Sequence, residues 1–195
     1  MQLDPGEALT RLLEGNRRFV AERPRAPVPS AKRVELANAQ HPFAAVLGCA
    51  DSRVPVETVF DQQPGDLFVV RLAGNIASGE AIGSLEYAVE ILGCSLVLVL
   101  GHSGCGAVQA AISLVESATA FPGHIALLAE AIAPAARRTR GAGENWWRAA
   151  VDDNARAASA RISHSPILRA AASRGGVRVA AAVYDLQSGL VSLLD

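Results

Sequence analysis

Cysteine, aromatic side chains and net charge are all scarce in this chain of 195 residues. Its three cysteines are a small and odd number, which argues against a disulfide framework and leaves metal binding or catalysis as their use. The 18 Lys and Arg residues nearly balance the 19 Asp and Glu residues, so we expect neither a nucleic acid nor a membrane surface as a partner.

A long hydrophobic run is also missing. The longest, over residues 91–100, is broken by Gly93 and Ser95 and falls short of the roughly 20 residues that span a bilayer. The first seven residues are acidic and hold no apolar stretch, so we expect no signal peptide and a cytoplasmic location.

Half of the residues are hydrophobic, which is ample for a core. Short apolar runs predict strands at residues 43–48, 66–72, 96–100 and 178–186. Helices are predicted between them at residues 78–92, with Ser78 as the N-cap, and at residues 106–117. This alternation predicts an α/β fold with a central, mainly parallel sheet of four or five strands flanked by helices. We see no boundary, so residues 1–195 are expected to form one domain.

The two ends of the chain are predicted to be helical. Residues 5–22 form an amphipathic pattern, and a proline-rich connector follows at residues 23–30. We expect this arm, residues 1–30, to reach away from its own subunit to a partner. Residues 123–174 are predicted to be helical, with breaks at Pro134 and near Pro166 and a glycine-rich turn at residues 141–143.

Two short motifs follow predicted strands. Cys49, Asp51 and Arg53 come directly after the first strand, and His102 and Cys105 come directly after the run LVLVLG. The carboxyl ends of strands in an α/β sheet are where ligands bind. Two thiols, an imidazole and a carboxylate at one sheet edge are zinc ligands, and two Cys with one His and a variable fourth position are typical of a catalytic zinc site. Each motif alone also fits an inert buried cysteine or a hydrogen-bonded core histidine.

These motifs carry a family resemblance. The segments QHPFAAVLGCADSRVP, PGDLFVVRLAGN, GSLEYAVEILG and LVLVLGHSGCGAV, together spanning residues 40–108, resemble consecutive blocks of the β-class carbonic anhydrases. The later segment VAAAVYDLQSG resembles the last strand of that family. The resemblance implies an enzyme that hydrates CO₂ reversibly to bicarbonate and a proton, by attack of a zinc-bound hydroxide.

The resemblance also assigns roles at the metal. Cys49, His102 and Cys105 match the permanent ligands of one Zn²⁺ per chain. Asp51 and Arg53 match a dyad: Arg53 holds Asp51 off the metal in one state, and Asp51 becomes the fourth ligand in the other. The simpler interpretation of Asp51 and Arg53 is a surface ion pair.

Three further residues match the family's substrate pocket. Gln40 matches a glutamine that donates a hydrogen bond to substrate, while Phe68 and Tyr87 match apolar positions contributed partly by the neighbouring subunit. The resemblance therefore implies a homodimer or a larger homo-oligomer. Ordinary core packing is the alternative for Phe68 and Tyr87.

A second, regulatory bicarbonate site of some family members uses a Trp, an Arg and a Tyr. Arg71 and Tyr184 match two of these positions, but Val46 stands at the Trp position. We therefore expect an unregulated enzyme, with water rather than Asp51 on the metal near neutral pH.

Two other functions stay open at this point. A hydrolase acting on another linear heterocumulene, such as carbon disulfide, would use the same ligands. A purely structural zinc site would need only the cysteines and the histidine, without the Asp51–Arg53 pair or Gln40.

Overall fold

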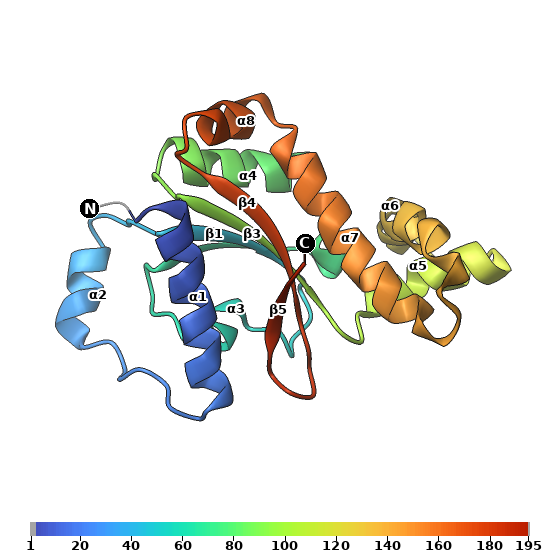
Figure 1. Cartoon of the computed structure of the whole chain (residues 1–195), viewed down its shortest axis with the longest axis horizontal. Coiled ribbons are helices and arrows are strands. Elements are labelled where there is room, and N and C mark those ends of the chain that lie inside the picture. Colours follow the sequence, from blue (N-terminus) through green and yellow to red (C-terminus); the bar gives the residue numbers. More distant parts are fainter. Residues whose placement is uncertain (1–2, 195) are drawn as a thin grey trace.

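A five-stranded sheet forms the centre of the computed structural model, which describes residues 3–194 (Figure 1). In the described part of the chain the strand order is β2-β1-β3-β4-β5. The bounds are β1 Ala44–Gly48, β2 Leu67–Arg71, β3 Leu96–His102, β4 Arg178–Tyr184 and β5 Val191–Leu194. The first four strands are parallel, and β5 pairs with β4 in the antiparallel direction. The predicted α/β fold is confirmed.

Helices bury both faces of this sheet (Figure 1). Alternate strand residues such as Leu47 and Val99 pack against α4 (Gly79–Glu90), α7 (Trp146–Ser163) and α8 (Pro166–Ser173). The residues between them, such as Val46 and Leu98, pack against α1 (Pro5–Val20) and α3 (Val56–Val59). Burial on both faces explains why β1 and β3 are continuous apolar runs rather than alternating ones.

The central pair of strands positions the candidate site. Because β1 and β3 are parallel, with Gly48 opposite Leu100, both chains leave the sheet at the same edge. Cys49 follows β1 directly, and His102 is the last residue of β3. Beyond this edge lie α5 (Gly106–Ser117) and α6 (Ile125–Arg138), which with α7 enclose a third cluster of buried residues (Figure 1). The 3₁₀ turns are η1 (Ala73–Asn75) and η2 (Arg140–Asn145).

The first helix lies on its own subunit, contrary to our expectation. Ala8 and Leu12 are fully buried in the cluster that covers one sheet face. At Gly15 an added Cβ would lie 1.8 Å from the carbonyl oxygen of Phe60, so the two backbones are in close contact. The proline-rich stretch suggested a detached arm because such segments are extended. It instead leads back along the subunit into a short helix, α2 (Ser30–Leu36), that we did not predict.

One buried amide ties α1 to two distant segments. The Asn16 Nδ2 group donates to the carbonyl oxygens of Val59 (3.1 Å) and Gly189 (2.8 Å). Its Oδ1 atom accepts from the Val191 N–H (2.9 Å), at the start of β5. The beginning and the end of the described chain are therefore joined at one side chain.

Two other expectations differ from the structure. Pro134 lies inside α6 and does not break it, because burial of neighbours such as Ile132 and Ala136 holds the helix together across the missing N–H. The edge strand β5 was not predicted, since its Ser192 and Leu193 are exposed and give no apolar run. No helix in residues 3–194 has the length and apolar character needed to cross a membrane.

Candidate metal centre

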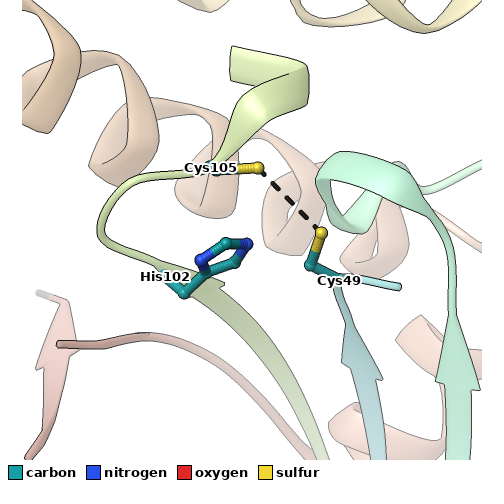
Figure 2. Close-up of side chains that lie close together, drawn as sticks. All are labelled: Cys49, His102 and Cys105. Atoms are coloured by element: carbon teal, nitrogen blue, oxygen red, sulfur yellow. Dashed lines mark hydrogen bonds between the residues drawn. The ribbon is translucent and has the colours of Figure 1, made fainter. Parts of the chain in front are cut away.

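Three side chains from the two predicted motifs converge at the sheet edge (Figure 2). They are Cys49, His102 and Cys105, all buried, and their ligand atoms lie within 4.8 Å of one another. The two sulfur atoms are 4.0 Å apart and share a hydrogen bond, drawn as the dashed line in Figure 2. Thus the structure brings together the three residues that the sequence nominated as permanent ligands.

The hydrogen bonding of the His102 imidazole leaves the lone pair of one ring nitrogen available to a metal ion. Its Nδ1 atom lies 3.0 Å from the carbonyl oxygen of Ser103, which can only accept a hydrogen bond, so Nδ1 carries the proton. In the neutral ring, the Nε2 atom then carries the free lone pair. It is fully buried and has no hydrogen-bond partner. A buried acceptor without a partner costs free energy unless something binds it, and a metal ion would do so.

The two thiols differ in their hydrogen bonds. Besides the contact with Cys105, the sulfur of Cys49 accepts from the N–H groups of Gly74 (3.2 Å) and Asp51 (3.4 Å). The hydrogen bond from Cys105 is the main reason why the pKa of Cys49 falls to about 4, and the same contact together with burial raises the pKa of Cys105. A cation bound to both sulfurs would take the place of the proton in the hydrogen bond between them.

These donors fit a divalent metal ion. Two thiolates and one neutral imidazole are soft to borderline ligands of the kind that Zn²⁺ takes in proteins. Three protein ligands leave one coordination position for water or substrate, whereas structural zinc sites have four protein ligands.

Asp51 is held beside this position by Arg53. The guanidinium donates two hydrogen bonds to the carboxylate, from Nε to Oδ1 (2.9 Å) and from a terminal nitrogen to Oδ2 (2.8 Å). These bonds hold the pKa of Asp51 well below its usual range. The Oδ2 atom lies 3.9 Å from Nε2 of His102, so the clamped carboxylate borders the ligand group. The pair is therefore part of the site and not an unrelated surface contact.

Other residues hold the ligand loops in place, and the sequence alone did not single them out for this. Arg71 donates to the carbonyl oxygens of Cys49 (3.0 Å) and Asp51 (2.6 Å). Gly74 has a φ of 70°, and a Cβ there would lie 2.4 Å from Cδ1 of Ile132, so only glycine fits. We named Arg71 only through the regulatory resemblance, and Gly74 carried no local signal beyond its residue type.

The predicted substrate residues lie elsewhere in the subunit. Gln40 and Tyr87 line one exposed hollow, and Phe68 lies next to Tyr87 with ring centroids 6.2 Å apart. Gln40 precedes β1 whereas Cys49 follows it, so about 16 Å of strand separates them at roughly 3.3 Å per residue. Within one chain these residues therefore do not reach the metal ligands.

The three positions compared with the regulatory site have other contacts in this chain. Val46 is fully buried under α1, and the guanidinium of Arg71 is occupied by the ligand loop. Tyr184 is buried in the same cluster as Val46.

Comparison with known proteins agrees with this geometry. Residues 44–191 match the family model described as carbonic anhydrase. The chain is 47% identical over 132 residues to carbonic anhydrase 2 of Mycobacterium tuberculosis, an alignment that spans 67% of this chain and 64% of that protein. It is 35% identical to a carbonic anhydrase of Pseudomonas aeruginosa, over 94% of this chain and 86% of the relative.

Solved structures with a similar fold are also carbonic anhydrases. A tetrameric β-carbonic anhydrase from Sordaria macrospora superposes with a TM-score of 0.77 at 26% identity, covering 83% of this chain and 85% of that one. The family match covers strands β1 to β4, the ligand motifs and the helices that enclose them. This chain therefore belongs to the β-class carbonic anhydrase family.

Proposed function

We propose that this protein catalyses the reversible hydration of CO₂ to bicarbonate and a proton, with one Zn²⁺ per chain. The observation that carries the proposal is the buried, unpartnered Nε2 atom of His102 facing two thiols, with a clamped carboxylate at its side. Membership of the family supports the reaction, and the donor set supports zinc.

Cys49, His102 and Cys105 would hold the ion. When bound, it supplies a Lewis acid that makes a water molecule nucleophilic near neutral pH. The protein's part is to fix the three ligands and to leave the fourth position open. The N–H groups on Cys49 and the Ser103 carbonyl on His102 fix the direction of two ligands.

Asp51 acts on whatever occupies the fourth position. Its carboxylate can only accept hydrogen bonds when ionised, so it orients a donor O–H and leaves an oxygen lone pair directed toward CO₂. Arg53 keeps the carboxylate in that role, because a free carboxylate next to a divalent cation would bind the cation itself. Ligation by Asp51 is the inactive alternative in this proposal.

We further propose that a second copy of the chain completes the substrate pocket. Gln40, Phe68 and Tyr87 lie together but at the far end of β1 from the ligands, so one subunit alone has an incomplete site. Tyr87 and the nearby Ile91 are large apolar residues with about half or more of their surface exposed, which is typical of an interface. The tetrameric relative supports a homodimer or a larger homo-oligomer.

The reduced cysteines favour the cytoplasm as the location, since zinc-ligating thiols oxidise readily in disulfide-forming compartments. A CO₂-hydration assay, a carbon disulfide assay and metal analysis on one sample test the function. We expect one zinc per chain and rapid CO₂ hydration. Zinc without turnover of either substrate would indicate a structural site, and turnover of carbon disulfide alone would indicate the other hydrolase.

A further inference from the structure

Helix α7 contacts one ligand loop and the turn η1 through two side chains seven residues apart. The indole Nε1–H of Trp147 donates to the carbonyl oxygen of Cys105 (3.2 Å). The Nδ2 group of Asn154 donates to the carbonyl oxygen of Gly74 (2.9 Å). Residues seven apart lie on one helix face, so α7 presents both donors to the same region.

Gly74 connects Asn154 to a metal ligand. Its carbonyl accepts from Asn154, and its N–H donates to the sulfur of Cys49 (3.2 Å). Glycine is the most flexible residue, so the direction of this N–H is fixed only if the surrounding structure holds the residue. Asn154 holds the carbonyl side of Gly74, and the side chain of Ile132 lies close to the same residue.

The position of Asn154 requires an explanation beyond packing. It is 7% exposed on a face of α7 whose other buried residues are all aliphatic, such as Ala150, Val151, Ala158 and Ile162. An aliphatic side chain would pack there without placing an amide in the interior, which is costly unless the amide is hydrogen-bonded. The Nδ2 group makes its hydrogen bond to Gly74, next to the metal ligand.

We infer that Asn154 is a positioning residue of the metal centre, which acts through Gly74 to aim an N–H···S hydrogen bond at Cys49. Such a bond withdraws electron density from a thiolate, so the bound metal keeps more of its positive charge. The inference rests on the proposed metal site, and its test is designed to separate the two.

The test compares Asn154→Leu, which keeps the volume and removes the donor, with Trp146→Phe. The control removes another hydrogen bond of α7, from the Trp146 indole to the Ala136 carbonyl (2.8 Å), which has no link to a sulfur. Each protein is loaded with Co²⁺. The sulfur-to-cobalt charge-transfer band and the Co²⁺ affinity are measured by absorption and by competition with a chelator.

We expect the Asn154→Leu band to move to longer wavelength, because a thiolate without the hydrogen bond gives up an electron more easily. We expect Co²⁺ affinity to fall about 10- to 100-fold, the usual effect of losing a residue that supports a ligand. The Trp146→Phe protein should keep the wild-type band and affinity. A wild-type spectrum and affinity in Asn154→Leu would overturn the inference even if its melting temperature is lower.

A measurement on the wild-type protein covers the case in which Asn154→Leu does not fold. In the cadmium-loaded protein, the Gly74 amide proton should show scalar coupling to cadmium through the N–H···S bond. Absence of this coupling while cadmium is bound would refute the inference alone. Failure of the wild-type protein to bind Co²⁺ or Cd²⁺ at Cys49 would instead refute the proposed metal site.

Discussion

The surroundings of each sulfur determine what each cysteine can do. Cys94 is fully buried, its thiol donates to the carbonyl of Pro42 (3.3 Å), and burial raises its pKa to about 12. It therefore stays a neutral thiol that packs in the core. Cys49 and Cys105 instead share a hydrogen bond next to the open lone pair of His102.

This difference predicts the outcome of two matched substitutions. Cys105→Ser should lose zinc, with affinity weakened at least 100-fold, because a hydroxyl does not ionise to replace a thiolate. Cys94→Ser, equally buried and equally conservative, should keep one zinc per chain. Metal analysis of both purified proteins makes the comparison, and full zinc content in Cys105→Ser would exclude it as a ligand.

The pair of Asp51 and Arg53 gives a second prediction about single residues. Arg53→Ala and Asp51→Ala should each keep zinc and lose most CO₂-hydration activity, by about 10- to 100-fold. Zinc should stay bound because neither residue belongs to the group of three buried ligand residues. Zinc content and stopped-flow hydration, measured on the same preparation, check this. Unchanged turnover in either variant would remove the dyad from the mechanism.

The site residues that stand in short sequence motifs could be predicted, and those that depend on contacts between distant segments could not. Cys49, His102 and Cys105 stand in short motifs after apolar runs, so the sequence shows both their type and their place. Asn154 lies 80 residues from Gly74, and no pattern in one sequence links them. Arg71 was noticed, but its bonds to the ligand loop depend on the register of β1 and β2.

Among the helices, α1 depends most on close backbone contact. Gly15→Ala should destabilise the protein by about 1–3 kcal/mol, or more, because the new Cβ would clash with the Phe60 carbonyl rather than with a flexible side chain. Gly83→Ala in α4 is the control, since nothing lies within 4 Å of the added Cβ. There we expect a gain of about 0.5–1 kcal/mol from helix propensity.

Thermal or urea unfolding of the two variants measures both effects. Equal stability of the Gly15→Ala protein and the wild type would mean that α1 does not pack on its own subunit.

Elements with strong periodicity were predicted well, and short or exposed ones were not. The central strands and α4, capped by Ser78, appear within a few residues of their predicted bounds. Helix α2 and strand β5 are too short and too exposed to give a pattern. The amphipathic pattern marked the buried face of α1, but the contact of Gly15 with the Phe60 carbonyl is one that hydropathy does not encode.

For the whole molecule, the proposed shared site predicts complementation between two defective proteins. Cys105→Ser lacks the metal and Gln40→Ala lacks the substrate hydrogen bond, so each alone should be nearly inactive. In a mixed dimer, the zinc of one chain would face the intact Gln40 of the other. Random pairing of equal amounts should restore about a quarter of the wild-type activity. If unfolding and refolding the mixture restored no activity, Gln40 would either act on the metal of its own subunit or have no part in the mechanism.

The pH profile of the proposed reaction gives a second prediction for the whole molecule. Arg53 keeps the pKa of Asp51 low, so this carboxylate is ionised throughout the physiological range and does not titrate there. Two thiolates leave the metal less positive than three imidazoles do, so its water should ionise above about pH 7. We expect kcat/KM to rise from about pH 6.5 to beyond roughly pH 8 as a single titration.

Stopped-flow hydration with and without added bicarbonate checks this profile. Because Val46 leaves no tryptophan at the regulatory position, bicarbonate should not steepen the curve. A steep, multi-proton loss of activity that bicarbonate worsens would contradict this prediction.

The hydrogen bonds of Asn16 have a consequence for the timing of folding. They join residues 173 and 175 positions apart, from the first helix to the start of the last strand. During synthesis α1 therefore emerges long before these partners do. Contacts of such high sequence separation form late and slow the final step of folding. A nascent chain stalled before Gly189 would thus leave the buried amide of Asn16 without its partners at Gly189 and Val191, although the apolar face of α1 could already pack on β1, β3 and α3.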